Sequence, residues 1–263
     1  MNWGKLFLRF LWIVFLTITT QIGGIVYIIA FLLYKKRPLK RGLAFIIVYL
    51  IATFAIVPYV APVFGREKIK TNDAIKIHMF FTSLANRDYV VPEVNIVLAD
   101  VSHVLRQSYP DVAIHCLDAN FPFFDGFPLL PHLSHKDGKK LDISLLYKNK
   151  EGNVTNAKPS ISGYGIFVSP REIEYDQITV CKQKGYWQYD FPKYLTLGTT
   201  HDDLNFSEDA TRKLLQSIVK HPSISKVFLE PHLRDRMKVR HPKLRYHGCR
   251  AVRHDDHIHL QVY

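Results

Sequence analysis

Two long apolar stretches near the amino terminus limit what this chain can fold into more than any other feature. The first runs from Phe10 to Tyr34 with Gln21 as its only strongly polar side chain, and the second runs from Gly42 to Phe64 without a charge. A helix needs about 20 apolar residues to cross the hydrocarbon core of a bilayer, and both stretches meet that length. The first is too long for the apolar part of a signal peptide, and no small-residue cleavage site follows it. We therefore expect a two-helix transmembrane hairpin, with helices over about 10–34 and 42–64.

Basic residues are concentrated around the loop between these stretches. Residues 1–65 contain seven Lys or Arg and no Asp or Glu, and five of the seven lie within residues 35–41. Short basic loops stay on the cytoplasmic side of a membrane. We therefore expect a multi-pass protein of the cytoplasmic (inner) membrane, with both the amino terminus and residues 66–263 on the outer, periplasmic side. In this arrangement Lys5 and Arg9 lie on the side that basic residues avoid.

The remaining charge does not indicate a nucleic-acid partner. Removing the seven charges of residues 1–65 from the formal net charge of +12 leaves +5 for residues 66–263. That part of the chain has no stripe of basic and aromatic residues, so we expect no nucleic-acid binding.

The pattern after the apolar stretches indicates a linker over 66–75 and a single α+β domain over 76–263. Apolar spacing predicts one helix between Pro92 and Pro110 and another between Ser207 and Pro222. Short apolar runs predict strands over 112–117, 141–147, 164–168, 226–229 and 256–263. Residues 169–205 have no clear period and are expected to form loops with short strands, and residues 232–253 to be irregular. We expect a small central, mostly antiparallel sheet with flanking helices.

The three cysteines Cys116, Cys181 and Cys249 lack CxxC spacing, which argues against a cysteine zinc site. The sequence allows one disulfide with a free thiol, or three buried thiols.

Two histidine-rich motifs carry the chemistry. One reads His132-Leu133-Ser134-His135-Lys136-Asp137-Gly138-Lys139-Lys140-Leu141-Asp142, and the other reads His254-Asp255-Asp256-His257-Ile258-His259. Side chains two apart on a strand share a face, so His257 and His259 point the same way. A neighbouring strand can bring Asp142 to that face. Two histidines and one aspartate give zinc three protein ligands and leave a fourth position for water.

The sequence also predicts roles for the other histidines of the motifs. Bound zinc lowers the pKa of a water to about 7 and polarises a carbonyl oxygen. Another residue must accept the proton, and His257 shares a face with the ligand His259. His254 and His132 are further candidates, for stabilising the developing oxyanion or for orienting the water.

Each motif taken alone has a plainer interpretation. A His-x6-Asp pair in a chain with thirteen histidines carries little information, and an HxH on a strand is common. The case for a metal site rests on both motifs occurring together in a strand context. Asp255 and Asp256 are either partners for the ring nitrogens or part of a solvated turn.

The two motifs resemble those of the penicillin-insensitive murein endopeptidases, HxxHxxGxxxD and HDxHxH. This family belongs to a wider group with lysostaphin-type peptidases, D-Ala-D-Ala metallopeptidases and the amino-terminal domains of Hedgehog proteins. The resemblance covers about thirty residues closely and about residues 90–263 loosely. Carried over by position, it implies His135, Asp142 and His259 as zinc ligands, His257 in the catalytic role, and His254 and His132 completing the site.

The resemblance implies a membrane-anchored zinc peptidase that cuts peptide cross-links of peptidoglycan outside the cytoplasmic membrane. The alternatives are a D-Ala-D-Ala carboxypeptidase or dipeptidase, and a non-catalytic, membrane-tethered binding module that holds zinc. The chain departs from the family pattern in its helical anchor and in residues 169–205, which match nothing in the family.

Overall fold

The computed structural model describes residues 3–263, which form two compact units. The first unit comprises Met1–Ile69, Phe80–Pro92 and Ala119–Lys139, and the second comprises Lys70–Met79, Glu93–Asp118 and Lys140–Tyr263. The first unit therefore contains both apolar stretches together with two later segments of the chain.

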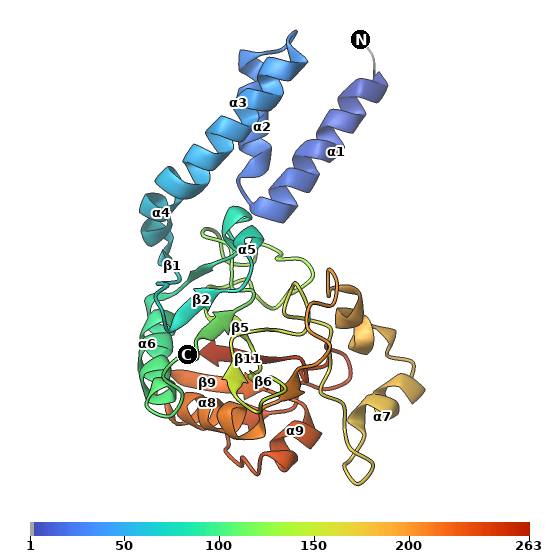
Figure 1. Cartoon of the computed structure of the whole chain (residues 1–263). Coiled ribbons are helices and arrows are strands. Elements are labelled where there is room, and N and C mark those ends of the chain that lie inside the picture. The colour runs from blue at the N-terminus through green and yellow to red at the C-terminus, as the bar shows by residue number, and fades with distance from the viewer. Residues whose placement is uncertain (1–2) are drawn as a thin grey trace. The chain divides into compact units, whose positions relative to one another are not determined.

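Helices form most of the first unit. They are α1 (Trp3–Thr20), α2 (Gly23–Leu33), α3 (Pro38–Ile51), the π-helical turn η1 (Ala52–Ile56), α4 (Val57–Val60), the 3-10 turn η2 (Ala61–Phe64) and α5 (Phe80–Leu84). Within this unit α1, α2 and α3 run side by side, each reversing the direction of the one before (Figure 1). Two helices, Trp3–Thr20 and Pro38–Phe64, are long and apolar enough to cross a membrane by length and composition.

The structure divides the first apolar stretch, which we expected to be a single helix over 10–34. The chain turns at Gln21, whose φ is 65°, and α2 then packs back along α1. A Cβ added at Gly24 would lie 1.9 Å from the Thr17 Oγ1 atom, so only glycine allows this close approach. The helical part is thus built from three segments instead of two.

This reversal brings basic residues of α1 and α3 to one end of the helices. The guanidinium of Arg9 on α1 lies 4.6 Å from the ring centre of Phe31 on α2, and that of Arg41 on α3 lies 5.4 Å from the same ring. Both arginines stack on one phenylalanine, next to the basic loop 35–41. The start of α1 is therefore at the loop end of the helices, whereas the two-helix prediction put it at the opposite end.

The segment expected to be a linker is part of the packed structure. Strand β1 (Glu67–Lys68) pairs with β3 (Tyr89–Val90), and Arg66 is only 2% exposed.

A six-stranded sheet forms the centre of the second unit. Its strands lie in the order β10 (Leu244–Arg245), β9 (Ile224–Phe228), β11 (His257–Val262), β5 (Lys140–Ser144), β4 (Ile114–Cys116) and β2 (Ile75–Ile77). The inner pairs are antiparallel, while β10–β9 and β4–β2 at the edges are parallel. The α+β class is confirmed, but the sheet is larger than the small, mostly antiparallel sheet we expected and is mixed. The strands β2 and β10 were missed because they are too short to give a period.

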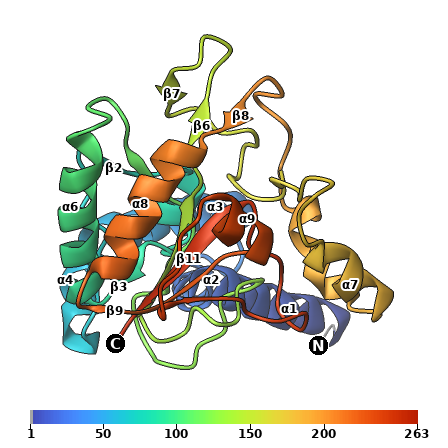
Figure 2. The same cartoon turned by 90° about the horizontal axis from the view of Figure 1, so that it is seen from below.

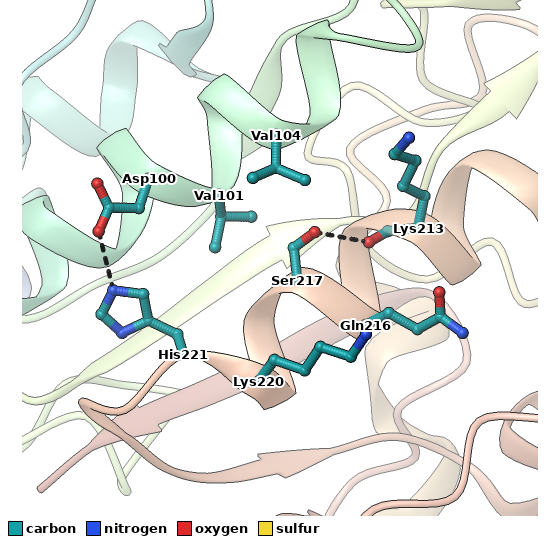
Figure 3. A pocket seen from close by; sticks show the side chains of 8 residues that line it. All are labelled: Asp100, Val101, Val104, Lys213, Gln216, Ser217, Lys220 and His221. Atoms are coloured by element: carbon teal, nitrogen blue, oxygen red, sulfur yellow. Dashed lines mark hydrogen bonds and ion pairs between the residues drawn. The ribbon is translucent and has the colours of Figure 1, made fainter.

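Two helices lie side by side in the second unit (Figure 2), namely α6 (Pro92–Arg106) and α8 (Glu208–Lys220). Both follow the predicted apolar spacing. They form a pocket (Figure 3). It is lined by Asp100 and Val104 of α6, by Lys213 and Ser217 of α8, and by His221, which directly follows α8. No residue of either histidine motif lines this pocket.

The remaining elements lie in segments whose structure the sequence did not predict. Residues 169–205 contain two helices that were not predicted, α7 (Gln177–Gln183) and the 3-10 helix η3 (Trp187–Tyr194), and α9 (Pro231–Arg236) lies in the segment expected to be irregular. A second sheet consists of β7 (Val154–Thr155), β6 (Tyr147–Lys148) and β8 (Asn205–Phe206). The predicted strand 164–168 is absent from the described chain, because Gly163 and Gly165 adopt φ values of +83° and +81° that interrupt extended backbone.

Candidate metal site

The register of two strands places the motif residues together. Strands β11 and β5 pair antiparallel, with His259 opposite Asp142 and His257 opposite Ser144. The intervening Ile258 and Leu260 are at most 1% exposed, and alternation places them on the other face of the sheet. The predicted shared face of His257, His259 and Asp142 is therefore confirmed.

Three of these side chains form a group that could hold a metal ion. One ligand atom from each of His135, Asp142 and His259 lies within 4.8 Å of the other two, and all three residues are buried. His259 Nδ1 lies 2.8 Å from Asp142 Oδ1. Two imidazoles and one carboxylate are the donor set of an open zinc site, so the residues present fit that metal.

His135 is oriented by the backbone. Its Nδ1 lies 2.7 Å from the carbonyl oxygen of Ala119, and a carbonyl can only accept. The proton is therefore on Nδ1, which leaves the Nε2 lone pair available to a metal ion. His132, the other histidine of this motif, is half-buried with its ring centre 5.6 Å from that of His135.

His257 is held by a buried carboxylate. Its Nδ1 lies 2.5 Å from Asp256 Oδ1, and its Nε2 lies 3.8 Å from Asp142 Oδ2. Burial lowers the pKa of His257, but the charges of Asp256 and Asp142 outweigh it and raise the pKa to about 9. Asp256 also accepts a hydrogen bond from the Gly165 N–H at 2.6 Å. Asp256 is thus a partner of a ring nitrogen, and the alternative of a solvated turn is wrong.

His254 lies against the other two histidines of its motif. Its ring centre is 4.9 Å from that of His257 and 5.8 Å from that of His259. Burial, followed by the neighbouring imidazoles of His257 and His259, lowers its pKa well below the usual value. Its backbone N–H donates to Glu230 Oε1 at 3.0 Å, which fixes the chain at this point.

Tyr164 is a site residue that sequence reasoning missed. Its hydroxyl donates to Asp142 Oδ2 at 2.9 Å, and its ring meets that of His257 edge-on with centres 5.0 Å apart. Burial and then the charge of Asp142 raise the pKa of Tyr164, so the hydroxyl stays protonated and orients the carboxylate. No sequence signal marks this residue, because a lone tyrosine after a glycine belongs to no motif.

A second missed group fixes the backbone before the HxH pair. Arg253 is buried and pairs with Asp255 and, at 3.0 Å, with Asp190 of η3. Tyr189 of the same helix donates from its hydroxyl to Glu230 at 2.6 Å. The unassigned segment 169–205 therefore braces the second motif.

A disulfide joins Cys181 of α7 to Cys249, and Cys116 is a buried cysteine outside this disulfide. The disulfide ties the segment 169–205 to the loop before the second motif. Of the two options left open by the sequence, the structure has one disulfide and one thiol.

A scan against protein-family models and a search of curated proteins found no match to the chain. The chemistry of the residues themselves therefore carries the functional argument.

Proposed function

We propose that this protein is a membrane-anchored zinc peptidase that hydrolyses peptide cross-links of peptidoglycan. The observation that carries the proposal is the group His135, Asp142 and His259, whose ligand atoms lie within 4.8 Å of one another. A zinc ion held there would supply an activated water and polarise the scissile carbonyl. The peptide substrate and the cross-link rest on the resemblance of the two motifs.

The surrounding residues have roles that fit hydrolysis. Asp256 fixes the His257 ring, so that Nε2 can take up and release a proton on the side of Asp142. The buried His254 ring can donate a hydrogen bond to a developing oxyanion. Tyr164 holds the Asp142 carboxylate in place through its hydroxyl. A module that only bound zinc would not need the His257–Asp256 pair, which favours an enzyme over the non-catalytic alternative.

Two features support a location in the cytoplasmic membrane with the peptidase domain outside. The disulfide between Cys181 and Cys249 is typical of proteins in oxidising compartments. The clustering of basic residues at one end of the helices fits a cytoplasmic position for that end.

The test uses the full chain in detergent micelles with cross-linked peptidoglycan fragments, and mass spectrometry of the products. We expect cleavage that a chelator abolishes and added zinc restores. Asp142→Ala should abolish cleavage, while Asp111→Ala, at an exposed aspartate, should leave it intact. The masses of the products identify the bond and separate an endopeptidase from a carboxypeptidase.

A second pair of variants separates catalysis from binding. His257→Ala should keep bound zinc and lose cleavage, whereas His103→Ala, at an exposed histidine of α6, should change neither. Stoichiometric zinc without cleavage in the unmodified chain would refute the enzyme and leave the binding module. A chain that binds no metal would refute both.

A further inference from the structure

The segment that carries His132 and His135 belongs to the same compact unit as the helices. Ala119–Lys139 groups with Met1–Ile69, and no helix or strand lies between β4 and β5. A segment without regular structure depends on contacts from outside itself for a fixed conformation. Part of that contact is backbone pairing with Arg87–Tyr89. Another part comes from two side chains that border the helices, Gln21 and Arg66.

Gln21 binds the segment from the turn between α1 and α2. Its Oε1 accepts a hydrogen bond from the Phe123 backbone N–H at 3.0 Å, and the side chain is 8% exposed. Among the described residues its Nε2 is buried without a hydrogen-bond partner. An unsatisfied buried donor costs stability. The buried amide therefore costs the helices stability, and its favourable contribution is the hydrogen bond to Phe123.

Arg66 binds the same segment directly after the last helical turn. Its guanidinium donates to the carbonyl oxygens of Phe121 and Phe123 and pairs with Asp125. The planar guanidinium offers several donors in fixed directions, so it can fix several backbone groups at once. A Cβ added at Gly138 would lie 3.0 Å from Arg66 Nε, so the far end of the segment also packs closely on this side chain.

Apolar contacts reinforce these polar ones. The ring of Phe64 lies 5.0 Å from that of Phe123 and 5.3 Å from that of Phe124. Phe123 also packs against a buried cluster that includes Tyr49 of α3 and Tyr89 of β3. The helices and the segment thus share one hydrophobic core.

We propose that Gln21 and Arg66 are positioning residues for the metal ligand His135, so that the membrane anchor is a structural part of the zinc site. The helices fix Phe121–Asp125, and the carbonyl of Ala119 in the same segment orients the His135 ring. The inference rests on the proposed function, because it takes His135 as a ligand.

The experiment measures zinc affinity of the full chain in detergent by competition with a chromophoric chelator. Gln21→Gly removes the amide but retains the backbone turn, since glycine adopts positive φ freely. Arg66→Lys keeps the charge but loses the planar guanidinium. We expect each variant to weaken zinc binding about tenfold, the size expected for losing one or two hydrogen bonds. Thr19→Ala, whose hydroxyl bonds only within α1, and Arg106→Lys on α6 serve as matched controls and should bind as the unmodified chain does.

A double-mutant cycle with His135→Ala distinguishes positioning from general destabilisation. We expect His135→Ala to weaken zinc binding, and Gln21→Gly to have no further effect in that background. An equal loss of affinity in both backgrounds, or no loss in either, would overturn the inference.

Hydrogen exchange separates this inference from the proposed function. Gln21→Gly and Arg66→Lys should speed exchange of the Phe121–Asp125 amides, and unchanged exchange would overturn the role of the anchor. A His135→Ala variant that binds zinc as tightly as the unmodified chain would instead refute the proposed ligand set and with it the positioning of a ligand. Faster exchange in that case would show only that the helices hold the segment.

Discussion

Lys158 makes the stability of the second unit depend on pH in a predictable direction. The residue is 3% exposed, and its Nζ donates to the carbonyl oxygen of Leu145 at 3.3 Å. Burial lowers its pKa from the usual 10.5 to about 7. Two imidazoles of the same unit, His78 and His115, also have lowered pKa values, with burial as the main cause and the Lys158 charge as the next. These imidazoles are therefore neutral over the range in which Lys158 titrates.

The sign follows from proton binding in the two states. Between pH 7 and 10.5 the unfolded chain binds the Lys158 proton and the folded chain does not, so the contribution of this group to stability rises with pH over this range. Below pH 7 both states are protonated and the cost of the buried charge is fully present. At about 1.4 kcal/mol per pH unit, the contribution of Lys158 to the free energy of unfolding should rise by on the order of 2–3 kcal/mol from about pH 6 to 9.

The assay is thermal unfolding of the full chain in detergent at pH 6 and pH 9, followed by intrinsic fluorescence. Lys158→Met retains the aliphatic length and cannot be protonated, so the part of the pH dependence due to this group should disappear. At roughly 2–4 °C per kcal/mol, the unmodified chain should gain several degrees of Tm relative to the variant between the two pH values. Lys184→Met, at an exposed lysine, should follow the unmodified chain. If Lys158→Met shows the same change in Tm between the two pH values as the unmodified chain, the amine is not held neutral by burial and the reasoning fails.

Three further outcomes test other parts of the structure. Asp256→Asn should leave zinc affinity nearly unchanged and reduce kcat for cleavage at least tenfold, because His257 loses its carboxylate partner. Zinc titration and kcat measure the two effects, and an equal loss of zinc affinity and of kcat would contradict this role. Cys181→Ser should lower the free energy of unfolding by about 2–4 kcal/mol, as for other disulfides that close long loops; an unchanged Tm under non-reducing conditions would argue that the disulfide does not form. In oriented membrane vesicles, Lys5→Cys and Lys36→Cys should react with an impermeant maleimide from the same side, because α1 begins at the basic-loop end of the helices; labelling from opposite sides would restore the two-helix hairpin.

The prediction of a uniform first helix failed for a reason visible in the residues. Hydropathy averages over a window, and Thr17, Gln21 and Gly24 are too few to lower it. Their effect depends on packing, since Gly24 lets α2 approach α1 and the Phe123 N–H satisfies the amide oxygen of Gln21. A contact between residues 102 positions apart leaves no pattern in a local window.

Strand alternation alone determined the shared face of His257 and His259 and placed the apolar residues between them on the opposite face. The sequence also determined the α+β class and the helices α6 and α8, because these follow from local periodicity. Only the tertiary structure decided that Asp142 stands opposite His259, that Tyr164 and Asp256 hold the site residues, and that the helices bind the segment carrying His135. These are pairings between distant parts of the chain, and their energy depends on register and burial, which arise only when the whole chain has folded.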